Sequence, residues 1–175
     1  MREFVAIDVG APEPRVSRRA AEHLTLRFLG EVASERNAGI IAALEGVART
    51  SRPFVLRLEG VGAFPSADRP RVVWTGVTVG REEVVELARA VRGALDGLLG
   101  ADEEAFVPHL TLFRVRTPAD REAARELLAG ARPAPPPRDV RVGELLLKES
   151  VLGPAGALHR TLAAFRLGGP VRGPD

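Results

Sequence analysis

The chain has 175 residues, 45% of them apolar, so its length and composition fit a single domain with a sizeable core. It has no cysteine, which excludes disulfides, thiolate nucleophiles and cysteine-ligated zinc. The formal net charge is +2, with Lys148 the only lysine among 25 basic residues, a balance that permits an RNA substrate without requiring one.

Short apolar and amphipathic segments alternate along the whole chain. In chain order the patterns predict strands at 4–7 and 23–29, a helix at 34–49, strands at 54–59 and 71–77, a helix at 82–99, a strand at 109–115, a helix from Pro118, and strands at 140–151 and 158–167. Several strand connections are too short for a crossover, which indicates antiparallel pairing. We therefore expect an α+β fold in which residues 1–175 form one domain.

No apolar stretch is long enough to span a bilayer, and the first residues lack the layout of a signal peptide. These features predict a cytoplasmic protein with no membrane partner.

The tetrapeptide His-Leu-Thr-Leu occurs at 23–26 and again at 109–112, and it uses two of the three histidines. Both copies fall in predicted strands, where side chains two residues apart share a face. His23 and Thr25 should therefore point one way while the leucines point into a core, and His109 and Thr111 should do the same. Two such strands facing one cleft would present two imidazoles and two hydroxyls to a single small group.

This set of groups suits phosphodiester cleavage. A neutral imidazole can take a proton from the attacking oxygen while a protonated one gives a proton to the leaving oxygen. Hydroxyls aided by arginine can hold the nonbridging oxygens, where negative charge builds up. A single His-x-Thr on a strand is more often a surface pair or a satisfied core histidine, and it is the matched repeat that favours catalysis.

Two histidines without an i,i+4 partner, a cysteine or a matched carboxylate make poor zinc spacing. There is also no Gly-x-Ser-x-Gly elbow and no Walker-type glycine-rich loop. We expect no metal and no cofactor.

The chain resembles the two-histidine (2H) phosphoesterase superfamily, specifically the RNA 2',3'-cyclic phosphodiesterases, also called 2'-5' RNA ligases. The segments that carry the resemblance span nearly the whole chain in the family's order: 4–8, 23–32, 62–66, 69–74, 108–112 and 148–154. The resemblance implies a two-lobed fold in which pseudo-twofold related antiparallel sheets, flanked by helices, surround a central cleft.

The resemblance also implies an activity. The family hydrolyses terminal 2',3'-cyclic phosphates of RNA to 2'-phosphates, and some members join RNA ends through a 2'-5' bond in the reverse sense. Carried over, His23 and His109 are the catalytic pair, and Thr25 and Thr111 bind phosphate. We assign water activation to His109 and protonation of the departing 3' oxygen to His23. The expected partner is RNA with a cyclic phosphate end, such as a tRNA fragment, or a small cyclic nucleotide, bound by a monomer.

Two arginines near the motifs are candidates for phosphate binding, for different reasons. Arg27 shares parity with His23 and Thr25, so a regular strand would point it into the cleft. Arg114 matches the arginine after the family's second motif, which implies phosphate binding. Its offset of five from His109 requires a β-bulge or a strand end. For either arginine the alternative is a solvated surface charge.

Two phenylalanines are candidates for base stacking. Phe64 lies in a Phe-Pro turn, where core packing is the favoured alternative, and Phe113 lies on the His109 face by parity, where it would stack on a base or crowd the cleft. His159, in the last predicted strand, is given no catalytic role.

Two questions stay open at this stage. The same chemistry would serve a smaller cyclic phosphate, a nucleotide or 2'-5' oligoadenylate, and a binding module without turnover is a further alternative. Only 13 residues, 10–22, separate the first strand from His23, fewer than relatives have. The shortening puts one wall of the cleft, and with it the substrate preference, in doubt.

Overall fold

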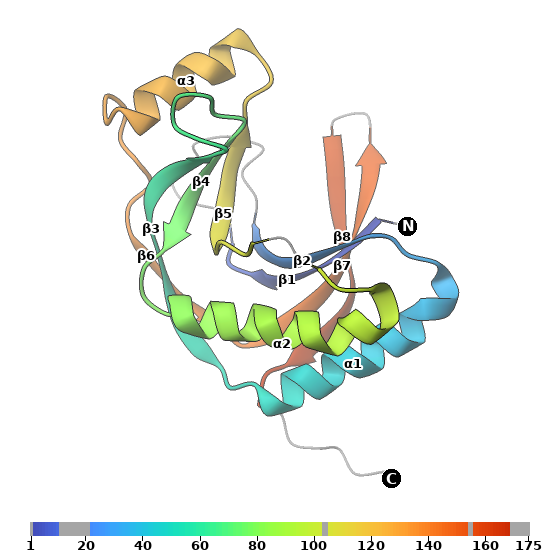
Figure 1. Ribbon diagram of the computed structural model, residues 1–175. Coiled ribbons are helices and arrows are strands. Elements are labelled where there is room, and N and C mark those ends of the chain that lie inside the picture. The colour runs from blue at the N-terminus through green and yellow to red at the C-terminus, as the bar shows by residue number, and fades with distance from the viewer. Residues whose placement is uncertain (1, 11–21, 103–104, 154–155, 169–175) are drawn as a thin grey trace.

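The computed structural model describes residues 2–10, 22–102, 105–153 and 156–168, and within them it has three α-helices and eight strands (Figure 1). In chain order these are β1 Arg2–Asp8, β2 His23–Glu31, α1 Asn37–Thr50 after a short 3₁₀ turn Ser34–Arg36, β3 Phe54–Phe64, β4 Val72–Val77, α2 Arg81–Leu99, β5 His109–Arg114, α3 Pro118–Leu128, β6 Arg138–Val142, β7 Glu144–Gly153 and β8 Gly156–Arg166.

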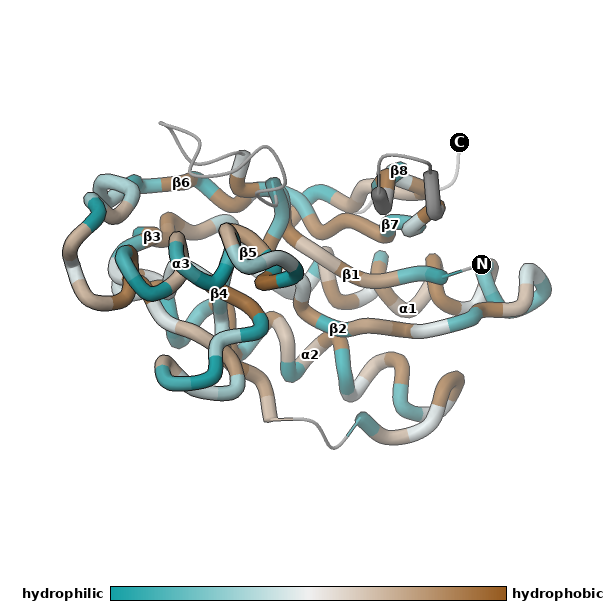
Figure 2. Tube along the Cα trace, turned by 90° about the horizontal axis from the view of Figure 1, so that it is seen from above, coloured by the Kyte–Doolittle hydropathy of each residue, from teal (hydrophilic) through white to brown (hydrophobic). Residues whose placement is uncertain are grey.

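The strands form two antiparallel sheets of four, with the orders β2-β1-β7-β8 and β5-β4-β3-β6. The repeated motif begins one edge strand of each sheet, β2 in the first and β5 in the second. These two edges lie beside each other near the centre of the molecule, as the view from above shows (Figure 2). The predicted α+β fold with two related sheets is confirmed.

The chain crosses between the sheets at Gly143. Residues 138–142 pair with β3 in the second sheet, whereas residues 144–153 pair with β1 and β8 in the first. The Gly143 carbonyl accepts a hydrogen bond from the amide of Leu167, just after β8. The prediction of one continuous strand over 140–151 was therefore wrong, because apolar alternation does not record which sheet a strand joins.

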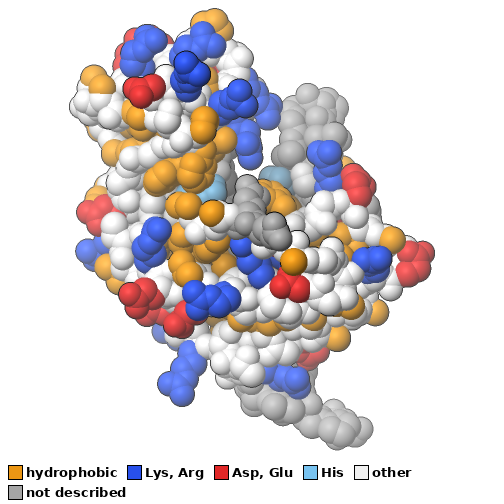
Figure 3. Space-filling model, in the orientation of Figure 1, with side chains coloured by type: hydrophobic (Ala, Val, Ile, Leu, Met, Phe, Trp, Pro, Cys, Tyr) orange, Lys and Arg blue, Asp and Glu red, His pale blue; other side chains and the backbone are white. Residues whose placement is uncertain are grey.

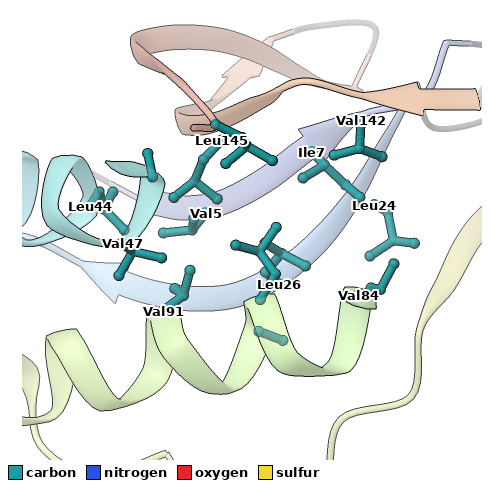
Figure 4. Packing of buried hydrophobic residues seen from close by; sticks show 14 of the residues in the cluster. Val5, Ile7, Leu24, Leu26, Leu44, Val47, Val84, Val91, Val142 and Leu145 are labelled. Carbon is teal, nitrogen blue, oxygen red and sulfur yellow. The ribbon is translucent and has the colours of Figure 1, made fainter. Parts of the chain in front are cut away.

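One large apolar core holds the two sheets and two helices together. Val5, Ile7, Leu24 and Leu26 of the first sheet pack against α1 and α2 (Figure 4). The second sheet adds buried residues to the same core from β3, β4, β5 and β6: Leu56, Leu58, Val77, Leu110 and Val142. The leucines of both motif copies are buried and anchor the motif strands, which leaves the other face of each strand free for the histidines.

A smaller apolar cluster lies beneath α3, which covers a separate part of the second sheet (Figure 1). Thr117 caps this helix: its hydroxyl accepts from the Asp120 amide, while the Asp120 carboxylate accepts from the Thr117 amide. Pro118 begins the helix, as predicted, and Leu127 is buried beneath it.

Within the described residues, no helix combines the length and the apolar character that crossing a membrane requires.

Candidate active site

The two motif histidines occupy matching positions at the starts of the two edge strands. His23 pairs with Asp8 of β1, and His109 pairs with Gly76 of β4. Both imidazoles are half-buried, as are Thr25 and Thr111 two residues further on. A space-filling view shows a hollow between the two halves of the molecule, with histidine side chains in it (Figure 3). The structure therefore brings the two motif copies together.

Each motif strand carries a β-bulge at the same point. In the first sheet, Thr25 pairs with Ala6 but Arg27 pairs with Val5, which leaves Leu26 as the extra residue. In the second sheet, Thr111 pairs with Trp74 but Phe113 pairs with Val73, which leaves Leu112 as the extra residue. An extra residue reverses the alternation of faces from that point on. The fourth residue after each histidine therefore joins the core face, and the fifth returns to the histidine face.

The bulge makes the prediction for Arg27 wrong. Its side chain is 5% exposed and is held by α2 instead of the cleft. It donates to the Arg92 carbonyl at 2.9 Å, to Asp96 Oδ1 at 3.0 Å and to the Gly100 carbonyl at 2.6 Å. With these acceptors engaged, Arg27 ties β2 to the end of α2 and is a structural residue.

The β-bulge in β5 also decides on which face Phe113 and Arg114 lie. Arg114 needed a bulge to reach the cleft, and the bulge is present; its side chain is exposed, and its charge acts on His109. Phe113, expected on the His109 face, is 7% exposed and packs in the cluster beneath α3. Its assignment to base stacking was wrong, because the bulge turns it to the opposite face from the one that simple alternation gives.

Phe28 is an aromatic residue that sequence reasoning assigned no role. It occupies the position in the first motif that Arg114 occupies in the second, five residues after the histidine. Its side chain is 66% exposed, and its ring centroid lies 6.1 Å from that of Phe4. The position of Phe28 on the histidine face follows from the sequence only if the bulge is included, because strict alternation would place its side chain on the core face.

His23 is packed among aromatic rings. Its ring centroid lies 4.9 Å from that of Phe4 and 4.8 Å from that of His159, which meets it edge-on. Burial, followed by the neighbouring His159 and Lys148, lowers the pKa of His23 to about 4. In the free protein at neutral pH this imidazole is therefore neutral.

His109 has its own aromatic neighbours and one fixed nitrogen. Phe64 meets its ring edge-on at 4.9 Å, and Trp74 lies at 6.2 Å. His109 Nδ1 lies 2.8 Å from the Val107 carbonyl oxygen, which can only accept, so this nitrogen carries the proton. Burial lowers the pKa of His109, the bond to Val107 opposes that shift, and the charge of Arg114 adds to it. In the neutral ring the lone pair is therefore on the second nitrogen, Nε2.

Phe64 lies beside the site as a packing residue of the His109 environment. Its half-buried ring contacts both Trp74, at 5.2 Å, and His109. Gly62 makes this arrangement feasible, because a Cβ at that position would come within 2.3 Å of the Trp74 indole. The contacts favour the packing interpretation of Phe64 over base stacking.

His159 is a neighbour of His23 that the sequence did not reveal. It lies on β8 opposite Ser150 of β7, yet its ring contacts both His23 and Phe4. The ammonium group of Lys148 donates to Thr161 Oγ1 at 3.2 Å. Burial lowers the pKa of His159, and the positive charge of Lys148 lowers it further. Because His159 lies outside the repeated tetrapeptide, only the pairing of β7 with β1 and β8 could have placed it here.

Two further expectations concern metals and the short segment after β1. The described residues contain no group of three or more histidine or acidic side chains placed to hold a metal ion. Residues 11–21, most of the shortened segment, lie outside the described residues.

Known proteins resemble this chain in sequence over most of its length. A family model described as the 2'-5' RNA ligase superfamily matches residues 7–151. A protein of Archaeoglobus fulgidus named RNA 2',3'-cyclic phosphodiesterase is 38% identical over 183 residues, covering 94% of this chain and 99% of that protein.

Solved structures show the same fold. The structure of TT0787 from Thermus thermophilus superposes with a TM-score of 0.74 at 29% identity, covering 97% of this chain and 99% of that one. The structure of LigT from E. coli complexed with 3'-AMP superposes with a TM-score of 0.69 at 26% identity, covering 96% and 98%.

Proposed function

Since the chain belongs to the 2'-5' RNA ligase superfamily, we propose that it hydrolyses 2',3'-cyclic phosphates at RNA ends to 2'-phosphates, with His23 and His109 as the acid–base pair. One observation carries the proposal: the two His-x-Thr edges lie beside each other and present two half-buried imidazoles in the same hollow. A pure binding module has no need of two matched proton-transfer groups.

In the proposed reaction His109 is the base. Its Nδ1–H is held by the Val107 carbonyl, so the lone pair of the neutral ring is on Nε2. This nitrogen takes a proton from water as the water oxygen forms a bond to phosphorus. The bond from phosphorus to the 3' oxygen breaks, and His23 gives that oxygen a proton. The product carries a 2'-phosphate and a 3'-hydroxyl.

His23 must be protonated to serve as the acid, although its pKa in the free protein is about 4. A bound phosphodiester is an anion, and an opposite charge next to an imidazole raises its pKa. Substrate binding should therefore raise the pKa of His23 and favour its protonated form when the leaving oxygen is in place. Thr25, Thr111 and Arg114 would hold the nonbridging oxygens, on which negative charge grows.

The same groups in the same roles would provide 2'-5' ligation with a different nucleophile. A 5'-hydroxyl takes the place of water, bonds to phosphorus and displaces the 3' oxygen, so that the strain of the cyclic phosphate supplies the driving force and no nucleotide cofactor is consumed. Incubating 5'-hydroxyl RNA with cyclic-phosphate ends at high concentration should yield a 2'-5' junction that 3'-5' specific nucleases leave uncut. Absence of this product, with hydrolysis intact, would limit the protein to hydrolysis.

The test of the main proposal is hydrolysis of an RNA oligonucleotide with a 2',3'-cyclic phosphate end, in EDTA and over a range of pH. We expect a 2'-phosphate product, a bell-shaped profile, and a loss of about 10²- to 10⁴-fold in kcat for His23→Ala and for His109→Ala. His159→Gln, which removes the third histidine, should stay within about tenfold of wild type. Activity abolished by EDTA would indicate a metal enzyme, and tight binding without turnover would indicate the binding module.

A further inference from the structure

The first lobe is the half of the molecule with the sheet β2-β1-β7-β8, and the second lobe is the half with the sheet β5-β4-β3-β6 and α3. A hollow lined by arginines lies on the second lobe, beyond the end of β5. Its walls come from the loop between β3 and β4, from Val115 after β5, and from α3, and its volume is about 530 Å³. Four of its lining residues are arginines: Arg69, Arg71, Arg121 and Arg125. Figure 3 shows basic side chains gathered on the upper lobe, where α3 lies, and along the edge of that lobe that faces the histidines.

The lining of the hollow carries more positive than negative charge. Among the described residues, only Arg125 of the four has an ion-pair partner, Glu122 one turn before it on α3, at 2.8 Å. Asp68 is the single acidic residue among those that line the hollow. Several guanidinium groups around one concavity raise the local concentration of anions and favour phosphate, which arginine binds with two parallel hydrogen bonds.

The hollow is joined to the candidate active site by one strand. β5 begins at His109 and ends at Arg114, and the amide of the next residue, Val115, donates to the Arg71 carbonyl at 2.9 Å. At about 3.3 Å per residue, His109 and Val115 are about 20 Å apart along the strand. Arg114 lies between them, so positive charge continues from the histidine to the hollow. One nucleotide is too short to reach both ends, whereas a short strand of RNA is long enough.

We propose that this arginine-lined hollow binds the sugar–phosphate backbone of the RNA strand on the 5' side of its reacting end. The inference rests on the proposed function, because a 2',3'-cyclic phosphate terminates the strand and leaves the rest of the RNA on that side. The lining has no aromatic residue, so it offers no stacking platform for bases, and recognition there is of phosphates. The protein should therefore prefer oligonucleotides of any sequence to cyclic mononucleotides.

The test compares two substrates in two matched variants. Arg69→Gln/Arg121→Gln removes one charge from the loop wall and one from the helix wall of the hollow. Arg49→Gln/Arg89→Gln removes two exposed arginines from α1 and α2, away from the hollow, and changes the net charge equally. Activity is measured on uridine 2',3'-cyclic phosphate and on a decanucleotide with a 2',3'-cyclic phosphate end.

For the hollow variant we expect kcat/KM on the decanucleotide to fall about tenfold at low salt, with less than about twofold change on the mononucleotide. The slope of log KM against log salt should decrease by about 1.4, since each phosphate contact to a single strand contributes about 0.7. The control variant should match wild type on both substrates. Equal losses on both substrates, or an unchanged decanucleotide activity, would overturn the inference.

Failure of the proposed function would leave the inference testable. If wild type turns over neither substrate, fluorescence anisotropy with a labelled decanucleotide ending in a 3'-phosphate measures backbone binding directly. Weaker binding by the hollow variant alone supports the inference, and equal binding by all three proteins rejects it.

Discussion

The two halves of the molecule use the same tetrapeptide and the same bulge, yet they sort the next two residues oppositely. After His-Leu-Thr-Leu the first strand continues Arg27-Phe28, and the second continues Phe113-Arg114. The fourth residue after each histidine turns into the protein, so one lobe buries an arginine and the other a phenylalanine. The fifth lies on the histidine face of the strand and is exposed, so one lobe presents an aromatic ring there and the other a charge. A matching arrangement of histidines and threonines is thus flanked by different side chains in the two lobes.

Replacing each of the two arginines in turn gives the largest expected effects. If Arg114 holds the nonbridging oxygens as proposed, Arg114→Gln should lower kcat/KM about 100-fold, while stability stays within about 0.5 kcal/mol. Arg27→Gln should cost about 2 to 4 kcal/mol of stability, because buried acceptors lose their donor. Urea denaturation and steady-state kinetics measure the two effects. Arg116→Gln, an exposed neighbour, is the control, and equal activity losses at 27 and 114 would contradict the comparison.

For the two phenylalanines the lobes exchange these effects: the second-lobe residue, Phe113, should matter for stability, and the first-lobe residue, Phe28, for substrate binding. Phe113→Ala removes a buried ring from the cluster beneath α3 and should destabilise the protein by about 3 kcal/mol. Phe28→Ala removes a 66% exposed ring, so stability should hold while KM rises about three- to tenfold through lost contact with a base. Thermal unfolding and initial rates distinguish these outcomes. A KM unchanged by Phe28→Ala would show that the aromatic face of the first lobe does not contact the substrate.

Acid should destabilise the protein through His23. Its pKa is lowered from 6.5 to about 4 on folding, so the unfolded chain takes up the proton first as pH falls. The contribution of neutral His23 to the free energy of unfolding is fully present above about pH 6.5 and is lost as the pH falls towards 4. Between about pH 7 and about pH 4.5 wild type should lose roughly 2 kcal/mol more than His23→Phe, as urea denaturation at each pH would measure. Parallel pH dependences of the two proteins would show that His23 titrates normally.

The smallest expected effect comes from Lys148. Its positive charge is the third cause of the low His23 pKa, after burial and His159. Lys148→Gln should raise that pKa by less than about one unit, which NMR titration of the ring protons of His23 would detect. The pKa of His109, on the other lobe, should not move. A shift in both histidines would mean that the two lobes are electrostatically coupled.

Strict alternation predicted the wrong face for Arg27 and Phe113, although it placed His23, Thr25, His109 and Thr111 correctly relative to their leucines. All four lie before the extra residue of the bulge, and the two errors lie after it. Nothing in the tetrapeptide itself marks the bulge, because Leu26 and Leu112 suit the core whether or not they are extra residues. The only clue in the sequence was the offset of Arg114 from His109, and it concerns the second copy alone.

The sequence by itself determined the two motif strands, the helices and the α+β class, because apolar periodicity follows from local burial and the His-x-Thr repeat marks matching positions on two strands. It could not record contacts between distant strands. Only the tertiary structure decided that β6 and β7 separate at Gly143, that His159 lies against His23, and that the arginines of α3 and of the β3–β4 loop share one hollow with the end of β5. Those contacts depend on sheet pairing, in which hydrogen bonds join backbone groups irrespective of side-chain identity.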